Sequence, residues 1–319
     1  MRTRLTDLLN LDVPIMLAGM GGVSYSALTA AVSRAGGYGC LGASTMTSEE
    51  LVRELALVRG ATDRPFGADL LTAFPDSLDR NVDIVIQGGA TALVAGLGVP
   101  ERVVDRCHRH NVLVISMCGK VDHARRARDA GCDIVIAQGT EAGGHTGTVA
   151  TMPLVPLIVD AMDDAIPVVA AGGIFDGRGI AAALALGAAG AWIGTRFIAT
   201  TEARAVPGFK ERLLASREDA TVITRAYTGK TMRVLRNRRT DRYDEHPELV
   251  KPFPQQLVAS LADGSFHLGG DESTEGIDQA EEGYPAGQAV GGITALVAAE
   301  QLVATLAAET EAAIARLVG

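Results

Sequence analysis

Aromatic residues are scarce in this chain of 319 residues, at 4% of the composition. Basic residues are also in the minority, because 29 Lys and Arg stand against 38 Asp and Glu and give a formal net charge of −9 at pH 7. Surfaces that bind nucleic acid or anionic membranes need an excess of basic residues. The composition therefore argues against both partners and favours a small-molecule ligand.

Long apolar runs and export signals are also missing. The most apolar stretches, such as 180–194, are interrupted or shorter than the roughly 20 residues that cross a bilayer, so no transmembrane helix is expected. Arg2 and Arg4 near the start are not followed by the hydrophobic core of a secretory signal. We therefore expect a cytoplasmic protein.

Cysteines are few, and their spacing is irregular. Cys40, Cys107, Cys118 and Cys132 form no C-x-x-C pair, so neither a disulfide framework nor a structural zinc site is expected. No H-E-x-x-H motif or Cys/His cluster occurs, and we expect no metal. The G-x-S-x-G motif is also absent, which argues against a serine hydrolase.

What the chain does contain is 37 glycines and a series of short apolar runs that alternate with helix-like segments. Eight runs are predicted as buried strands, each separated from the next by room for one helix: 13–17, 39–41, 65–70, 91–95, 113–116, 133–137, 168–171 and 191–193. Segment 78–87 has a strand-like composition, but it falls where a crossover helix is needed. The count predicts an α/β fold of the (β/α)8 TIM barrel type, with a doubly wound open sheet as the alternative.

The alternation of predicted strands and helices ends after Ile198. Charged residues then become dense, and residues 262–285 hold seven Asp and Glu without any Lys or Arg. We predict a smaller inserted annex over 209–283, mainly helical and loop, that could act as a substrate lid. The barrel would comprise 1–208 and 284–319, and an amphipathic helix over about 292–317 would close it.

Glycines follow two successive predicted strands. Gly172 and Gly173 come after the seventh strand, and Gly194 and Thr195 come after the eighth. In barrels these two loops commonly bind phosphate, because glycine allows a close approach and free N–H groups donate to an anion. The alternative is that these glycines only make tight turns. Neither loop fits a Walker or G-x-G-x-x-G motif, so a mononucleotide or phosphosugar is favoured over a dinucleotide.

The loop after the sixth predicted strand, QGTEAGGHTG at 138–147, places four glycines around His145. Barrel enzymes carry out catalysis at this rim, and an imidazole can exchange a proton or donate a hydrogen bond near neutral pH. His145 is therefore a candidate catalytic residue. The other histidines, in predicted helices or in the annex, are interpreted as solvent-exposed: His108, His110, His123, His246 and His267.

Several segments together resemble one enzyme family. They are PI at 14–15, GM at 19–20, RAGGYGCLGA at 34–43, the QGTEAGGHTG loop, AAGGIFDGRG at 170–179, GTRF at 194–197 and YPAGQAVG at 284–291. The combination resembles the nitronate monooxygenases, formerly called 2-nitropropane dioxygenases, and the closely similar FMN-dependent enoyl-acyl-carrier-protein reductases. It is highly specific for the superfamily and much less specific for the reaction.

The resemblance implies an FMN at the mouth of the barrel. Its phosphate would rest on the two glycine loops, its ring would be backed by the loop after the first strand, and further contacts would come from the His145 loop and the last segment: Ala18, Gly19, Met20, Gln138, Gly143, Gly172, Gly173, Gly194, Thr195 and Gln288. His145 matches the family's catalytic histidine. It would face the substrate nitro group and could abstract the α-proton from neutral nitroalkanes.

Two features depart from the family pattern. Many relatives carry Asn in a GVN motif after the third strand, where this chain has Asp69, and an anion near the substrate would disfavour a bound nitronate. The annex segment 228–237 offers Lys230, Arg233 and Arg236 as a cationic strip. That strip is either a solvated surface or a binding site for the phosphate of CoA, a carrier protein or a nicotinamide cofactor.

Three functions follow from these expectations, given in decreasing order of preference. The first is FMN-dependent oxidation of alkyl nitronates by O2 to carbonyl compounds and nitrite, without a nicotinamide. The second is reduction of an enoyl thioester, on a carrier protein or CoA, or of a quinone, with NAD(P)H. The third is binding of a phosphorylated ligand without redox chemistry. The oligomeric state stays open, although the annex or the terminal helix could form a homodimer interface.

Overall fold

The computed structural model describes residues 1–73 and 75–318. Its centre is a ring of eight parallel strands in the order β1-β9-β8-β6-β5-β4-β3-β2. The strands are β1 (Ile15–Leu17), β2 (Gly39–Gly42), β3 (Phe66–Leu71), β4 (Ala92–Gly96), β5 (Leu113–Cys118), β6 (Ile134–Gln138), β8 (Val168–Ala171) and β9 (Gly190–Ile193). A parallel bridge between Met16 and Tyr38 joins β1 to the start of β2 and closes the ring. The predicted (β/α)8 barrel is confirmed.

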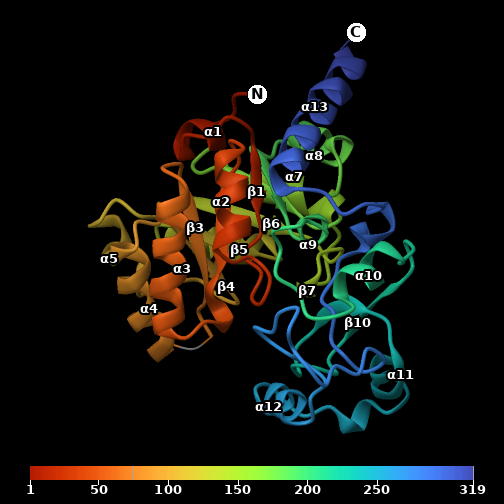
Figure 1. Cartoon of the computed structure of the whole chain (residues 1–319). Coiled ribbons are helices and arrows are strands. Elements are labelled where there is room, and N and C mark those ends of the chain that lie inside the picture. The colour runs from red at the N-terminus through yellow and green to blue at the C-terminus, as the bar shows by residue number, and fades with distance from the viewer. Residues whose placement is uncertain (74, 319) are drawn as a thin grey trace.

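Helices surround this ring, as Figure 1 shows. They are α2 (Ser26–Arg34), α3 (Ser48–Ala61), α4 (Pro75–Gln87), α5 (Val104–His108), α6 (Val121–Asp129), α7 (Thr151–Met162), α8 (Gly177–Ala185) and α13 (Ala299–Val318). Helix α4 covers segment 78–87, as expected. Helix α13 packs between α8 and α2 and so completes the ring of helices.

The terminal helix begins at Ala299, later than the predicted start near 292. Residues Gln288–Gly292 form the 3-10 turn η3 instead, and Val297 makes a parallel bridge with Thr200. The chain before α13 is therefore held in extended and turn conformations by contacts that an amphipathic pattern does not reveal.

The barrel interior is filled by apolar side chains. Met16, Ile136 and Trp192 belong to one buried cluster inside the ring. Helix α1 (Arg4–Leu9) adds Leu5 and Leu9 to this cluster and covers the end of the barrel nearest the N-terminus. Because this end is covered, the opposite end, where the strands terminate, is left for a ligand.

The annex lies at that opposite end, below the barrel in Figure 1. After the short α9 (Thr195–Ile198) it comprises α10 (Phe209–Leu214), β10 (Thr221–Thr224), β11 (Met232–Leu235), α11 (Arg238–Glu245), the 3-10 turn η2 (Pro247–Leu249) and α12 (Gln255–Ala262). The sequence did not predict its small antiparallel sheet, β10-β11-β7, whose third strand β7 (Gly144–His145) comes from the barrel. This sheet joins the predicted catalytic loop to the annex.

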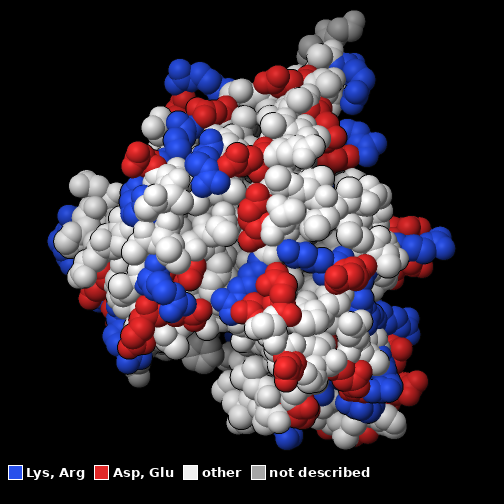
Figure 2. Space-filling model, viewed as in Figure 1, with Lys and Arg blue, Asp and Glu red and all other residues white. Residues whose placement is uncertain are grey.

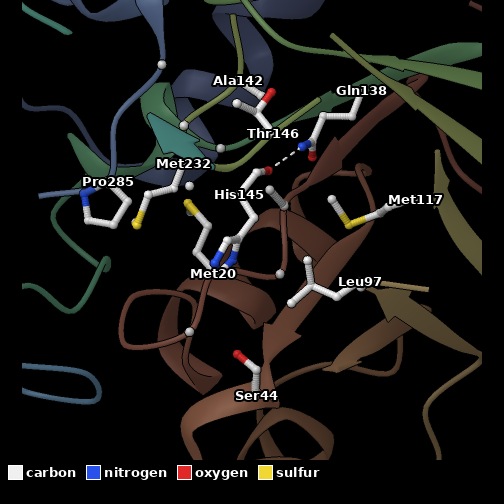
Figure 3. A pocket seen from close by; sticks show the side chains of 18 of the residues that line it. Met20, Ser44, Leu97, Met117, Gln138, Ala142, His145, Thr146, Met232 and Pro285 are labelled. Atoms are coloured by element: carbon white, nitrogen blue, oxygen red, sulfur yellow. Dashed lines mark hydrogen bonds between the residues drawn. The ribbon is translucent and has the colours of Figure 1, made fainter. Parts of the chain in front are cut away.

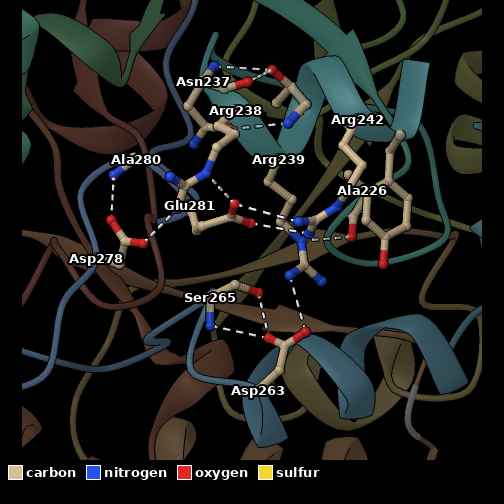
Figure 4. Close-up of polar contacts among 12 residues, drawn as sticks. Ala226, Asn237, Arg238, Arg239, Arg242, Asp263, Ser265, Asp278, Ala280 and Glu281 are labelled. Carbon is tan, nitrogen blue, oxygen red and sulfur yellow. Dashed lines mark hydrogen bonds and ion pairs between the residues drawn. The ribbon is translucent and has the colours of Figure 1, made fainter. Parts of the chain in front are cut away.

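A buried arginine organises the annex, as Figure 4 shows. Arg239 is 2% exposed and donates to Asp263 and to Ser260, each over 3.0 Å. Its guanidinium also lies 5.4 Å from the Tyr227 ring centre and 5.1 Å from that of Tyr243. The annex thus relies on a polar network as well as on its small apolar cluster.

Basic and acidic side chains intermingle over the face shown in Figure 2, with no large area of one sign. None of the helices in the described part of the chain is both long and apolar enough to cross a membrane.

Candidate active site

The strand ends and the annex enclose a cavity of about 930 Å³. Every predicted catalytic and cofactor-binding residue except Gln288 lines this cavity, and so does Asp69: Ala18, Gly19, Met20, Asp69, Gln138, Gly143, His145, Gly172, Gly173, Gly194 and Thr195. Figure 3 shows the His145 ring inside the cavity beside Met20. The structure therefore brings together residues from the ends of five strands, β1, β3, β6, β8 and β9.

Gln288 does not reach the cavity. Its side chain is exposed, while its neighbours Gly287 and Ala289 line the wall. The backbone N–H of Gln288 donates to the carbonyl of Glu141 over 2.9 Å, and that of Gly287 donates to the Thr195 hydroxyl over 2.9 Å. The main chain of this segment braces the cavity wall, and the Gln288 side chain points away from it.

The two glycine loops form a cradle that fits the phosphate of FMN. Gly172 and Gly173 adopt φ angles of 105° and 73°, a region that favours glycine. The backbone N–H groups of Gly173 and Gly194 have no hydrogen-bond partner among the described residues. Free N–H groups that face a cavity suit an anion, so these residues could hold the cofactor's phosphate.

The His145 loop is held to the barrel by polar contacts. Glu141 accepts hydrogen bonds from the backbone N–H of Thr151 over 2.9 Å and from its hydroxyl over 2.8 Å. Gln138 donates from Nε2 to the carbonyl of His145 over 2.8 Å. A Cβ added at Gly172 would lie 2.7 Å from the Thr151 hydroxyl, so glycine is needed there for packing as well. These contacts hold the loop in place as part of the cavity wall.

The His145 ring is held from the annex. Its Nε2 lies 3.0 Å from the hydroxyl of Thr228. Burial, and then the nearby Lys230 ammonium, lower the pKa of His145 to about 4. The imidazole is therefore uncharged at neutral pH, where it can accept or donate a hydrogen bond.

The predicted cationic strip does not form. Lys230 lines the cavity with its ammonium 4.4 Å from the Phe253 ring centre. Arg233 is 6% exposed and donates to the carbonyl of Thr140 over 3.0 Å, while Arg236 is exposed and pairs with Asp241. Only Arg233 lies in β11, while Lys230 precedes the strand and Arg236 follows it, and the three side chains have different partners.

Asp69 lines the cavity as expected, but its charge differs from the expectation. The side chain is buried, and Oδ1 has no hydrogen-bond partner in the described structure. Burial raises the pKa of this carboxyl well above its usual range, which favours the uncharged acid. Electrostatic repulsion of an anionic substrate is therefore much weaker than the sequence suggested.

Sequence reasoning missed several residues of the wall. Thr228 is separated from His145 by 83 residues, so no local motif links them. His267 was interpreted as solvent-exposed, but its side chain is only 24% exposed, lines the cavity and contacts the buried Glu282. Lys120, at the N-cap of α6, and His123 and Arg126, within that helix, also line the cavity. Their spacing of three residues places them on one helix face, which was the available signal.

Residues 1–73 and 75–318 contain no cluster of side chains suited to bind a metal ion. No group of three or more His, Cys, Asp or Glu side chains there could hold a metal ion. The four cysteines are buried free thiols.

Comparison with known proteins yields consistent similarities. A family model described as nitronate monooxygenase matches residues 2–81 and 72–309. A Mycobacterium tuberculosis protein named (3aS,4S,5R,7aS)-5-hydroxy-7a-methyl-1-oxo-octahydro-1H-indene-4-carboxyl-CoA dehydrogenase is 41% identical over 237 residues, which cover 74% of this chain and 66% of that protein, just under two thirds.

Two solved structures are similar over nearly the whole chain. FabK from Thermotoga maritima has a TM-score of 0.88 at 33% identity and covers 99% of this chain and 98% of its own. A nitroalkane oxidase from Streptomyces ansochromogenes has a TM-score of 0.85 at 32% identity, with coverage of 98% and 99%. These similarities agree on one fold and one broad chemistry, and they differ in the reaction.

Proposed function

We propose that this chain, which belongs to the nitronate monooxygenase family, oxidises alkyl nitronates with dioxygen to carbonyl compounds and nitrite. Its membership makes it an FMN-dependent oxidoreductase with a small-molecule substrate. When bound, FMN would supply the electron transfer between the nitronate and dioxygen. Family membership does not identify the substrate, so the choice of a nitronate must be supported by the geometry of the cavity.

The main support is the electrostatic character of the wall. Three acidic side chains line the cavity: Asp69, Glu141 and Glu282. Burial favours the uncharged form of Asp69. Glu141 accepts hydrogen bonds from Thr151, and the carboxyl group of Glu282 contacts the ring of His267. Four basic side chains also line it: Lys120, Arg126, Arg225 and Lys230. The basic side chains of the wall therefore outnumber the acidic ones, and each acidic side chain is either favoured as the uncharged acid or already contacts a partner.

His145 is suited to a substrate that is already deprotonated. A base with a pKa of about 4 is weak, so it removes a proton from a neutral nitroalkane inefficiently. As a neutral hydrogen-bonding group, however, it can orient the oxygens of a nitronate. We therefore assign orientation of the nitronate to His145 and attraction of its charge to Lys230.

Product analysis tests this proposal. The purified holoenzyme is incubated with ethylnitronate in air, and oxygen uptake, nitrite and acetaldehyde are measured together. We expect nitrite release and oxygen consumption without NADH or NADPH, and faster turnover of ethylnitronate than of nitroethane. Turnover that requires a pyridine nucleotide would contradict the proposal.

A second candidate is favoured by the size of the cavity. A volume of about 930 Å³ lies near the upper end of the usual range for ligand pockets, and Lys120 and Arg126 at its wall could meet phosphate oxygens. The similarity to a CoA-ester dehydrogenase points the same way. This candidate is an NAD(P)H-dependent FMN enzyme that acts on an acyl thioester, and bleaching of the flavin by NADPH or NADH would favour it.

A further inference from the structure

Arg233, in strand β11 of the annex, is a buried cation that the proposed reaction does not use. Its side chain is 6% exposed. The neighbouring Arg236 and Arg239 pair with carboxylates, whereas none of the ion pairs within residues 1–73 and 75–318 includes Arg233. Burial lowers the pKa of this guanidinium, and the charge of Glu141 partly offsets that effect. Burying a cation is costly, so its hydrogen bonds must offset a desolvation penalty.

These hydrogen bonds join two annex strands to the His145 loop. Arg233 donates from Nε to the carbonyl of Thr140 over 3.0 Å and from Nη1 to the hydroxyl of Thr221, in β10, over 3.2 Å. The Thr140 carbonyl accepts no other hydrogen bond from a described residue. Arg233 also lies opposite Gly144 where β11 pairs with β7. One annex side chain therefore holds a loop carbonyl that would otherwise be left without a donor.

The His145 loop is closed at its base, so its residues are displaced together. Gln138 donates from its side chain to the carbonyl of His145 over 2.8 Å, as Figure 3 shows. The hydroxyl of Thr146 donates to the carbonyl of Gly139 over 3.2 Å. Because these two contacts join the beginning of the loop to its end, a displacement at Thr140 is transmitted to His145.

The loop is held from two sides. On the barrel side, Glu141 accepts hydrogen bonds from Thr151. On the annex side, backbone contacts come from the pairing of β7 with β11 and from the N–H of Thr146, which donates to the carbonyl of Thr231 over 3.3 Å. Among the annex side chains that the structure describes, Arg233 alone donates to the main chain of the loop. A substitution of Arg233 thus removes one annex contact and leaves the backbone contacts in place.

We propose that Arg233 is a positioning residue, which holds the His145 loop from the annex and thereby sets the place of the His145 ring in the cavity. The inference rests on the proposed function, which gives His145 its role in the reaction. It adds that this role depends on an arginine that is not among the residues lining the cavity.

Hydrogen exchange tests this without turnover. The holoenzyme and Arg233→Met, at equal flavin content, are transferred to D2O, and peptides that span 138–147 are followed by mass spectrometry. The N–H groups of Thr140 and Thr146 are hydrogen-bonded in this loop and report its opening. We expect exchange in 138–147 to be about tenfold faster in Arg233→Met, the scale of losing one buried hydrogen bond from a charged donor.

Three further variants separate positioning from folding. Arg239→Met is the matched control, because Arg239 is also a buried annex arginine but donates to Asp263 and Ser260; exchange in 138–147 should stay within about twofold of the wild type. Arg233→Lys keeps a charged donor and should restore most of the protection. If Arg233→Met does not fold, the uncharged and shorter Arg233→Gln replaces it, with the same faster exchange expected.

Steady-state kinetics with ethylnitronate provide the second readout. Arg233→Met should lower kcat about tenfold and change KM by less than about twofold, because a displaced ring orients the reacting group poorly while the charges of the cavity wall are kept. Arg233→Lys should recover most of kcat. Unchanged exchange in 138–147 for Arg233→Met, or an equal increase in Arg239→Met, would overturn the proposal.

The two readouts distinguish this proposal from the proposed function. If Arg233→Met accelerates exchange in 138–147 but the wild type does not oxidise ethylnitronate, Arg233 holds the loop and nitronate oxidation fails. If the wild type and Arg233→Met oxidise ethylnitronate equally and exchange alike, the reaction stands and the positioning role fails.

Discussion

The two sides of the cavity wall are built in different ways. The barrel side consists of strand ends that contribute glycines, apolar side chains and the buried Asp69, together with basic side chains of the α6 region such as Lys120 and Arg126. The annex side contributes polar side chains held by partners, such as Thr228, Lys230 and His267. From this difference we infer that the barrel provides the shape and the proposed cofactor cradle, while the annex determines the chemical character of what binds there.

The two cavity histidines show this contrast directly. His145 belongs to the barrel loop, has an uncharged hydroxyl as its partner and has its pKa lowered to about 4 by burial. His267 belongs to the annex and has a carboxyl group as its partner. One imidazole is thus kept neutral near the centre of the barrel mouth, while the other is paired with an acid in the annex wall.

The largest effect is expected from removing the barrel histidine. His145→Ala should lower kcat/KM for ethylnitronate by about a hundredfold, the scale of losing a positioned polar catalytic group. Flavin content should stay normal, because the proposed phosphate cradle of Gly172, Gly173 and Gly194 does not include the imidazole. Steady-state kinetics and the flavin absorbance check both points. A loss that merely follows flavin content would contradict this role.

The next largest effect concerns the stability of the annex. Arg239→Met should lower the free energy of unfolding by about 2 kcal/mol, because it removes a buried guanidinium that binds Asp263 and Ser260. Arg236→Met is the matched control, since Arg236 makes an exposed ion pair with Asp241 and should cost less than about 1 kcal/mol. Urea denaturation measures both. Equal costs would show that the buried network does not stabilise the annex.

A smaller effect is expected where the annex meets the barrel histidine. Thr228→Val removes the hydroxyl that lies 3.0 Å from His145 Nε2 and should lower kcat about tenfold, because the ring loses its orienting partner. Thr228→Ser keeps a hydroxyl and should recover most of the rate. If valine and serine behave alike, the contact does not position His145.

The smallest effect on activity is expected at Asp69. Since burial favours its uncharged form, Asp69→Asn should change KM for ethylnitronate by less than about threefold. Much tighter nitronate binding by the variant would show that the carboxyl is ionised.

Stability should respond to the same substitution with a definite pH dependence. A raised pKa in the folded state means that the stability associated with Asp69 is fully present below its unfolded pKa of about 4 and is lost as pH rises toward the folded value. Asn cannot ionise, so the melting temperature of Asp69→Asn relative to the wild type should increase from pH 5 to pH 8. A constant difference would contradict the raised pKa.

The barrel side was largely predictable from the sequence. Local signals, namely short apolar runs and the glycines that follow them, predicted all eight strands and placed Gly172, Gly194 and His145 at the strand ends. Even the ambiguous segment 78–87 was correctly assigned to a helix, because the barrel pattern leaves no room for another strand there.

The annex side was not predictable, because its contacts connect residues far apart in the chain. The contact between His145 and Thr228 spans 83 residues, and that between Arg233 and the carbonyl of Thr140 spans 93. The second contact makes Arg233 structural, although its charge suggested ligand binding. Gln288 differs in another way, since the family resemblance placed this residue near the flavin, whereas the structure shows an exposed side chain and a backbone that supports the cavity wall.

The measurement that tests the central claim most directly is an anaerobic absorbance titration of the purified holoenzyme with ethylnitronate in one cuvette and with NADPH or NADH in another. Nitronate oxidation by this cavity predicts reduction of the flavin by ethylnitronate and little or no response to pyridine nucleotides. Rapid bleaching by NADPH or NADH, with no response to the nitronate, would contradict that claim and favour a thioester reductase.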